Sequence, residues 1–96
     1  AKSGRLSVFI GREAKLNRAV LQILALKGPL TIYDMYKEVK ALRGFRQVRY
    51  ASVNKRVRSL EELGYIRKTG VKKTKAGFEA SRYELTARAY LAILLS

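Results

Sequence analysis

The spacing of apolar residues along the first two thirds of the chain predicts three helices. Within residues 12–27, 32–43 and 50–63, apolar side chains recur every three or four positions, so each helix would bury one stripe. The stripes comprise Leu16, Val20, Ile23 and Leu24 in the first helix, Ile32, Met35, Tyr36 and Val39 in the second, and Val53, Val57, Leu60 and Leu63 in the third.

The boundaries of these helices carry residues suited to caps. Gly28-Pro29 would end the first helix, because proline cannot continue it. Thr31 would cap the second through its hydroxyl, with Asp34 in the first turn, where negative charge suits the helix dipole. Gly64 would follow the third helix in the left-handed conformation. Leu30-Thr31 is expected to be only a short extended link.

The last third of the chain predicts a two-stranded hairpin followed by a helix. The strands would be Tyr65–Lys68 and Phe78–Leu85, with Gly70 and Gly77 framing the turn between them, so that the hairpin spans 65–85. A final helix is expected over residues 87–96, capped by Thr86. The chain would thus be mainly α with a small antiparallel β-sheet, an α+β fold.

The length and the N-terminal segment add little to this picture. A chain of 96 residues favours a single domain. Residues 1–11 would form an N-terminal arm, in which residues 7–10 are either a short strand or an apolar contact with a partner.

Charge changes the picture more than length does. Lys and Arg number 21 against 7 Asp and Glu, for a net charge of +14. Residues 49–77 hold nine basic and two acidic residues, residues 1–48 hold ten and three, and residues 78–96 hold two of each. This asymmetry predicts a positive face that attracts polyanions in a salt-dependent way.

The composition also argues against several classes of protein. The sequence has no Cys and no His, which excludes disulfides and the common zinc sites and removes the usual general base and thiol nucleophile. We therefore expect neither an enzyme nor a cofactor. No segment approaches the ~20 apolar residues of a membrane helix or resembles a secretory signal, so a cytoplasmic, nucleoid-associated protein is expected. Asn and Gln are scarce, which fits a thermophilic source.

The order helix, link, helix, helix, strand, turn, strand, helix resembles the winged helix-turn-helix regulators of archaea and bacteria. The resemblance covers roughly residues 16–86 and is carried by Gly28-Pro-Leu-Thr31, by Val53-x-x-x-Val57-x-x-Leu60-Glu-Glu-Leu-Gly64-Tyr-Ile66, and by Tyr83-Glu-Leu-Thr86. It implies a three-helix core, a two-stranded wing, a C-terminal helix and double-stranded DNA as partner. The connector 41–49 departs from the pattern, because the simplest helix-turn-helix has a turn of about 3–4 residues.

In this fold the third helix enters the major groove. On a wheel of about 100° per residue, Val53, Val57 and Leu60 face inward while Lys55 and Ser59 face outward. The candidates for base edges are Ser52, Asn54, Lys55 and Arg56, with Arg58 a turn further on toward phosphate and Ser59 on the same face. A charged outer face that is merely solvated remains the alternative.

Two further sets of residues are candidates for phosphate or minor-groove contact. The wing contributes Arg67, Lys68, Lys72, Lys73 and Lys75, and the connector contributes Arg46, Gln47 and Arg49. Lysines on a hairpin also protect an exposed strand edge from aggregation, and both roles are compatible.

The final helix is apolar nearly all round, so its own domain would cover only part of it. A symmetric homodimer through Tyr90, Leu91, Ile93, Leu94 and Leu95 would cover the remainder. The alternatives are that residues 8–10 cover this helix or that it belongs to a longer helix.

The leading hypothesis is a sequence-specific DNA-binding regulator. The charge fits a non-specific architectural protein equally well, and winged-helix folds also serve as protein–protein modules. RNA is a lesser option. The sequence indicates no effector ligand.

Overall fold

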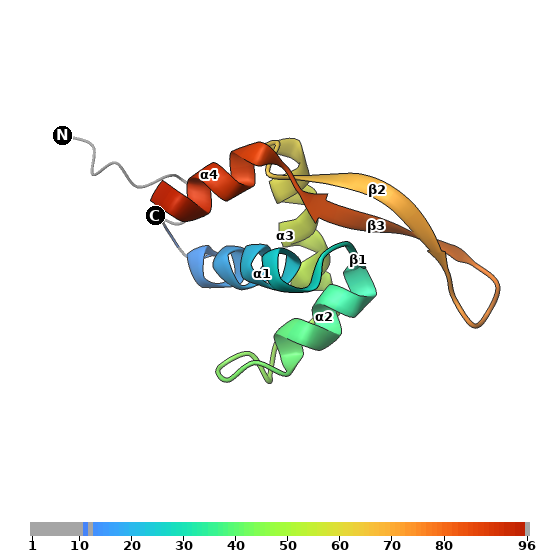
Figure 1. Cartoon of the computed structure of the whole chain (residues 1–96). Coiled ribbons are helices and arrows are strands. Elements are labelled where there is room, and N and C mark those ends of the chain that lie inside the picture. Colours follow the sequence, from blue (N-terminus) through green and yellow to red (C-terminus); the bar gives the residue numbers. More distant parts are fainter. Residues whose placement is uncertain (1–10, 12, 96) are drawn as a thin grey trace.

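Four helices and three strands follow one another within residues 11 and 13–95, which are those that the computed structural model describes (Figure 1). Their order is α1 (Ala14–Lys27), β1 (Leu30–Thr31), α2 (Ile32–Lys40), α3 (Tyr50–Glu62), β2 (Ile66–Lys73), β3 (Glu79–Leu85) and α4 (Ala87–Leu95). Residues 1–10 of the predicted arm, together with 12 and 96, lie outside the described residues. Within the described ranges, none of these helices is long and apolar enough to cross a membrane.

The sheet has three strands in the order β1-β3-β2, all antiparallel, where two were predicted. The additional strand is Leu30–Thr31, which we expected to be a link. Leu30 pairs with Tyr83 and Thr31 with Arg82. The expectation was wrong because two extended residues carry no periodicity of their own, yet their backbone groups can pair with an open edge of β3.

Strand β2 is longer than predicted. It was expected to end near Lys68 but continues to Lys73, and Gly70 lies in the strand beside an irregularity of the pairing rather than in the turn. The tip is formed by residues 74–78, where the Thr74 N–H donates to the Phe78 carbonyl at 2.7 Å. Of β2 only Ile66 is buried, so the strand shows no apolar alternation that could have revealed its length.

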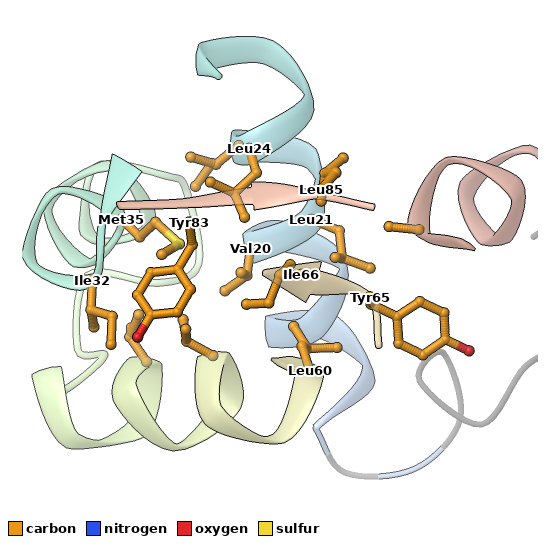
Figure 2. Close-up of a cluster of buried hydrophobic side chains, with 14 of the residues drawn as sticks. Val20, Leu21, Leu24, Ile32, Met35, Leu60, Tyr65, Ile66, Tyr83 and Leu85 are labelled. Atoms are coloured by element: carbon orange, nitrogen blue, oxygen red, sulfur yellow. The ribbon is translucent and has the colours of Figure 1, made fainter. Parts of the chain in front are cut away.

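The core lies between the helices and one face of the sheet. The predicted stripes of the helices are buried there, and the strands add Ile66, Tyr83 and Leu85 (Figure 2). Each fully buried large apolar side chain contributes about 1.5–3 kcal/mol. The fully buried side chains include Val20, Leu21, Met35, Val39, Val53, Val57 and Leu60. This packing holds α3 by its inner face.

The predicted caps of α2 and α3 are present. The Thr31 hydroxyl accepts from the Asp34 N–H at 3.1 Å. After α3, Gly64 has φ +84° and its N–H donates to Glu61, while the Tyr65 N–H donates to the carbonyl of Leu60. Helix α2 ends at Lys40 and not within 42–44 as expected, because the chain turns there into the connector.

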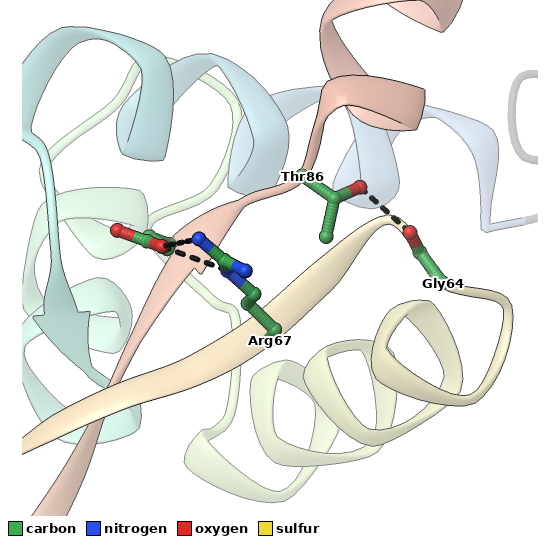
Figure 3. Close-up of polar contacts among 4 residues, drawn as sticks. Gly64, Arg67 and Thr86 are labelled. Carbon is green, nitrogen blue, oxygen red and sulfur yellow. Dashed lines mark hydrogen bonds and ion pairs between the residues drawn. The ribbon is translucent and has the colours of Figure 1, made fainter.

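A small polar network locks α4 onto the end of α3 (Figure 3). The Thr86 hydroxyl donates to the Gly64 carbonyl at 2.7 Å, and Arg88 Nη1 donates to the Leu63 carbonyl at 2.8 Å. The Arg88 guanidinium also lies 5.5 Å from the centre of the Tyr65 ring. A cation at the C-terminal end of α3 suits the helix dipole.

Candidate nucleic-acid interface

Helix α3 presents two chemically different faces. Val53, Val57 and Leu60 are fully buried, as the wheel predicted. The opposite side is exposed and free of acid along its first ten residues, with Lys55 and Arg58 pointing outward. The outer face of α3 is therefore a cationic rod held rigidly by its buried side.

The predicted α3 candidates divide between two flanks. Ser52, Lys55 and Arg56 border a shallow hollow of about 260 Å³ that also touches Glu13 at the start of α1. Arg58 turns the other way, toward the wing. Asn54, Arg56 and Ser59 are half-buried, because they lie on the flanks of the helix.

The wing candidates likewise face different ways. Arg67 is bound by its cross-strand partner Glu84, with its Nη2 2.7 Å from the carboxylate (Figure 3). Lys68 lies opposite Tyr83 in the pairing, and neighbouring residues of a strand point to opposite faces. Arg67 therefore lies on the face away from Tyr83 and the core, whereas Lys68 shares their face.

Lys72 links the wing to the first turn of α2. Its Nζ lies 2.9 Å from Oδ2 of Asp34, 38 positions away in the sequence. Burial opposes ionisation of Asp34, but the hydrogen bonds from Lys72 and Thr31 and the charges of Lys72 and Lys37 outweigh it and lower the pKa of this carboxyl. Lys72 was expected at the tip and instead lies on the strand, tied to α2.

A groove runs between α2, α3 and the wing, and we call it the wing groove. Its outer part has a volume of about 470 Å³ and its inner part, next to α3, about 180 Å³; Thr31, Tyr33 and Ala80 line both. The cations along it are Lys37, Lys72, Lys73 and Lys75 in the outer part and Arg58 and Lys68 in the inner part, and Asp34 is the sole acid among its lining residues. Sequence reasoning missed Lys37, although it lies four residues after Tyr33 and hence on the same helix face.

Three tyrosines tie the start of α3 to α2. The rings of Tyr36 and Tyr50 meet edge to face at 5.7 Å between centres, and Tyr33 lies 6.1 and 6.5 Å from them. Lys37 and Lys40 each lie 5.5 Å from a ring centre, over Tyr33 and Tyr36. Tyr36 is half-buried rather than part of the closed core, because its ring lies at the edge of this cluster.

The connector candidates lie beside this cluster. Arg46, Gln47 and Arg49 are all exposed, while Phe45 and Val48 between and before them pack against the core. Arg49 immediately precedes α3, and no side chain caps this helix N-terminus. The connector therefore presents two cations near backbone N–H groups that suit an anion.

Helix α4 exposes apolar side chains. Its buried residues are only Ala89 and Ala92, and Ile93 packs in part against the core. Of the five residues predicted for a dimer interface, the other four are exposed: Tyr90 at 50%, Leu91 at 59%, Leu94 at 79% and Leu95 at 71%.

Comparison with known proteins identifies the fold. No protein-family model matches the sequence, and no curated protein matches it significantly. Among solved structures, Bacillus subtilis PadR in complex with operator DNA matches with a TM-score of 0.68 and 21% identity, over 86% of this chain and 46% of PadR. TA0346 of Thermoplasma acidophilum, provisionally assigned as a transcriptional regulator, matches with a TM-score of 0.64 and 19% identity, over 83% of this chain and 78% of that one.

This chain thus spans less than half the length of PadR. Both matches are winged-helix structures, so the predicted winged helix-turn-helix fold is confirmed, with a third strand added to its sheet.

Proposed function

We propose that this protein binds double-stranded DNA and acts as a sequence-specific transcriptional regulator. The observation that carries the proposal is the shared position of two cationic features. The exposed face of α3, led by Lys55, and the wing groove, lined by six cations and one acid, lie side by side on one rigid body. A groove of one sign of charge concentrates the polyanion that fits it.

In this proposal α3 reads bases and the wing holds the backbone. Lys55 and Arg56 can donate to guanine and Asn54 can bond to adenine in the major groove, with Ser52 and Ser59 on the same side. Lys73 and Lys75 then contact phosphates or the adjacent minor groove. The connector cations Arg46 and Arg49, with Gln47 between them, meet phosphates near the start of α3.

The comparisons support this assignment at the level of fold. PadR is a winged-helix protein seen with operator DNA, and TA0346 bears a regulator's name. The proposal that the present chain does the same rests on its own charges and geometry.

We further propose a homodimer formed through α4. Tyr90, Leu91, Leu94 and Leu95 form an exposed apolar face on this helix, and burying it against a second copy removes it from water. A two-fold axis there would present two α3 helices to half-sites about one DNA turn apart.

A non-specific architectural role is the second candidate, because the net charge of +14 would attract any duplex. The two roles differ in the ratio of affinities for a preferred and an unrelated duplex, which is typically 10³ or more for specific proteins. Selection of bound duplexes from a random pool at moderate salt distinguishes them. Enrichment of one motif supports the regulator, and recovery of unrelated sequences supports the architectural protein.

The role of α3 is tested with Lys55→Ala/Arg56→Ala, measured against a duplex from that selection over a salt series. We expect the slope of log affinity against log salt to fall by about 2, because two phosphate-competing or base-contacting cations are lost. The matched control is Lys15→Ala/Arg43→Ala, which removes the same charge from exposed positions near α1 and the connector. Equal effects of the two double variants would reduce the interaction to net charge and refute a specific role for α3.

A further inference from the structure

The inner part of the wing groove is a small pocket built from three elements. The start of α2 contributes Tyr33, α3 contributes Tyr50 and Arg58, and the sheet contributes Lys68 and Tyr83. Its volume of about 180 Å³ equals roughly six water volumes at ~30 Å³ each. Sites for drug-sized ligands are larger, about 300–1,000 Å³, so the pocket suits a small group with a few waters.

Tyr83 gives this pocket an unusual polar group. The residue is only 2% exposed and its ring is part of the core, yet it also lines the pocket. Figure 2 shows its hydroxyl pointing from β3 toward α3. Within residues 11 and 13–95 this hydroxyl has no hydrogen-bond partner. A hydroxyl held at the floor of a pocket without a partner offers a donor to whatever enters.

The charges around Tyr83 select an anion. Arg58 and Lys68 both line the pocket, and neither forms an ion pair with a described residue. Glu61 lies close enough to Tyr83 to affect it but does not line the pocket. Burial raises the pKa of the Tyr83 hydroxyl, partly offset by Arg58, so this group remains protonated and able to donate at neutral pH.

The pocket also lies on the path of a bound duplex. It opens beside the outer face of α3 and continues into the part of the groove lined by Lys72, Lys73 and Lys75. A backbone strand that passes between α3 and the wing would run along this row of cations. A phosphate is the group of that strand whose size and charge fit a pocket with two cations and a hydroxyl donor.

We propose that this pocket binds one phosphate of the DNA backbone, with the Tyr83 hydroxyl donating to a phosphate oxygen and Arg58 and Lys68 supplying the charge. The inference rests on the proposed DNA-binding function and deepens it. Because Tyr83 is fixed by the core, it would set the position of the duplex relative to α3 without reading any base. Surface lysines on the wing lack this rigidity.

The decisive variant is Tyr83→Phe, which removes the hydroxyl and keeps the ring. Since that hydroxyl has no partner in the free protein, we expect the melting temperature to stay within about 2 °C of wild type. Affinity should fall about tenfold for preferred and unrelated duplexes alike, since hydrogen bonds to charged groups contribute about 1.5–3 kcal/mol. The salt slope should not change for this neutral substitution, whereas Arg58→Gln should lower it by about 1.

The matched control is Tyr65→Phe. Tyr65 is buried to a similar extent, but its ring lies under Arg88 near α4, away from the groove. This variant should bind duplex as wild type does. The double variant Tyr83→Phe/Arg58→Gln should lose less affinity than the product of the two single losses, because both residues share one phosphate.

Three results separate the possible failures. If wild type binds no duplex, the proposed function fails and the pocket assignment fails with it. If wild type binds and Tyr83→Phe equals Tyr65→Phe, the pocket assignment alone is overturned. If Tyr83→Phe leaves duplex affinity unchanged but weakens binding of inorganic phosphate, followed by NMR, the pocket takes a free anion and the assignment to the DNA backbone is overturned.

Discussion

Helices α3 and α4 follow the same construction rule but expose opposite chemistry. Each buries one side against the core, with Val53, Val57 and Leu60 in α3 and two alanines in α4. On the exposed side α3 carries cations and α4 carries leucines and a tyrosine. The large buried side chains show that α3 is anchored deeply, while the small ones show that α4 lies close to the body and leaves its large side chains outside.

This difference indicates what each surface is for. An outer cationic face costs nothing in water and gains from a polyanion, so it points to DNA. An outer apolar face is unfavourable in water and is stabilised when covered, so it points to another apolar surface. The contacts of Thr86 and Arg88 with the end of α3 fix the two faces in one geometry. A dimer formed through α4 would thereby determine where both α3 helices lie.

The sharpest contrast between the two helices is between a buried and an exposed leucine. Leu60→Ala should lower the free energy of unfolding by about 2–5 kcal/mol, because it leaves a cavity beneath α3. Leu94→Ala, at a position 79% exposed, should change it by less than about 0.5 kcal/mol in dilute solution. Urea unfolding at low protein concentration measures both. Similar losses would show that α4 is anchored by the same core as α3.

The apolar face of α4 is tested by adding charge to it. Leu91→Glu/Leu94→Glu should weaken the dimer at least a hundredfold, about 2.7 kcal/mol, because it places like charges on both sides of a symmetric interface. Sedimentation over a concentration series measures this. The control Leu26→Glu adds charge at an apolar residue that is 84% exposed on α1 and should leave the assembly unchanged. A wild-type protein that sediments as a monomer throughout would refute the dimer.

The smallest expected effect concerns the tie between the wing and α2. Because the pKa of Asp34 is lowered in the folded protein, its contribution to stability is present above the unfolded value of about 3.9 and is lost as pH falls through the folded value. Both partners are partly exposed, so Asp34→Asn should cost no more than about 1 kcal/mol at pH 7. The difference from wild type should shrink below about pH 4 in urea unfolding. A difference that stays constant from pH 3 to 7 would contradict the pair.

Sequence reasoning predicted most of the helical part of this fold and little of the wing. The caps at Thr31 and Gly64 and the inner face of α3 have local signatures, because a cap or a stripe involves residues only a few positions apart. The full length of β2 has none, since its residues after Ile66 are exposed and stabilised by pairing with β3. The candidate site divides in the same way: the cations were identifiable, but their division between two flanks and the binding of Arg67 by Glu84 were not.

The sequence by itself determined which residues are buried in the helices, where the helices begin and end, and the sign of the charge on the exposed surface. These properties follow from periodicity, caps and composition, which act over short distances along the chain. Only the tertiary structure decided that Leu30–Thr31 joins the sheet, that Lys72 meets Asp34, and that the Tyr83 hydroxyl opens between Arg58 and Lys68. Each of these depends on segments far apart in the sequence, whose meeting is set by how the core packs.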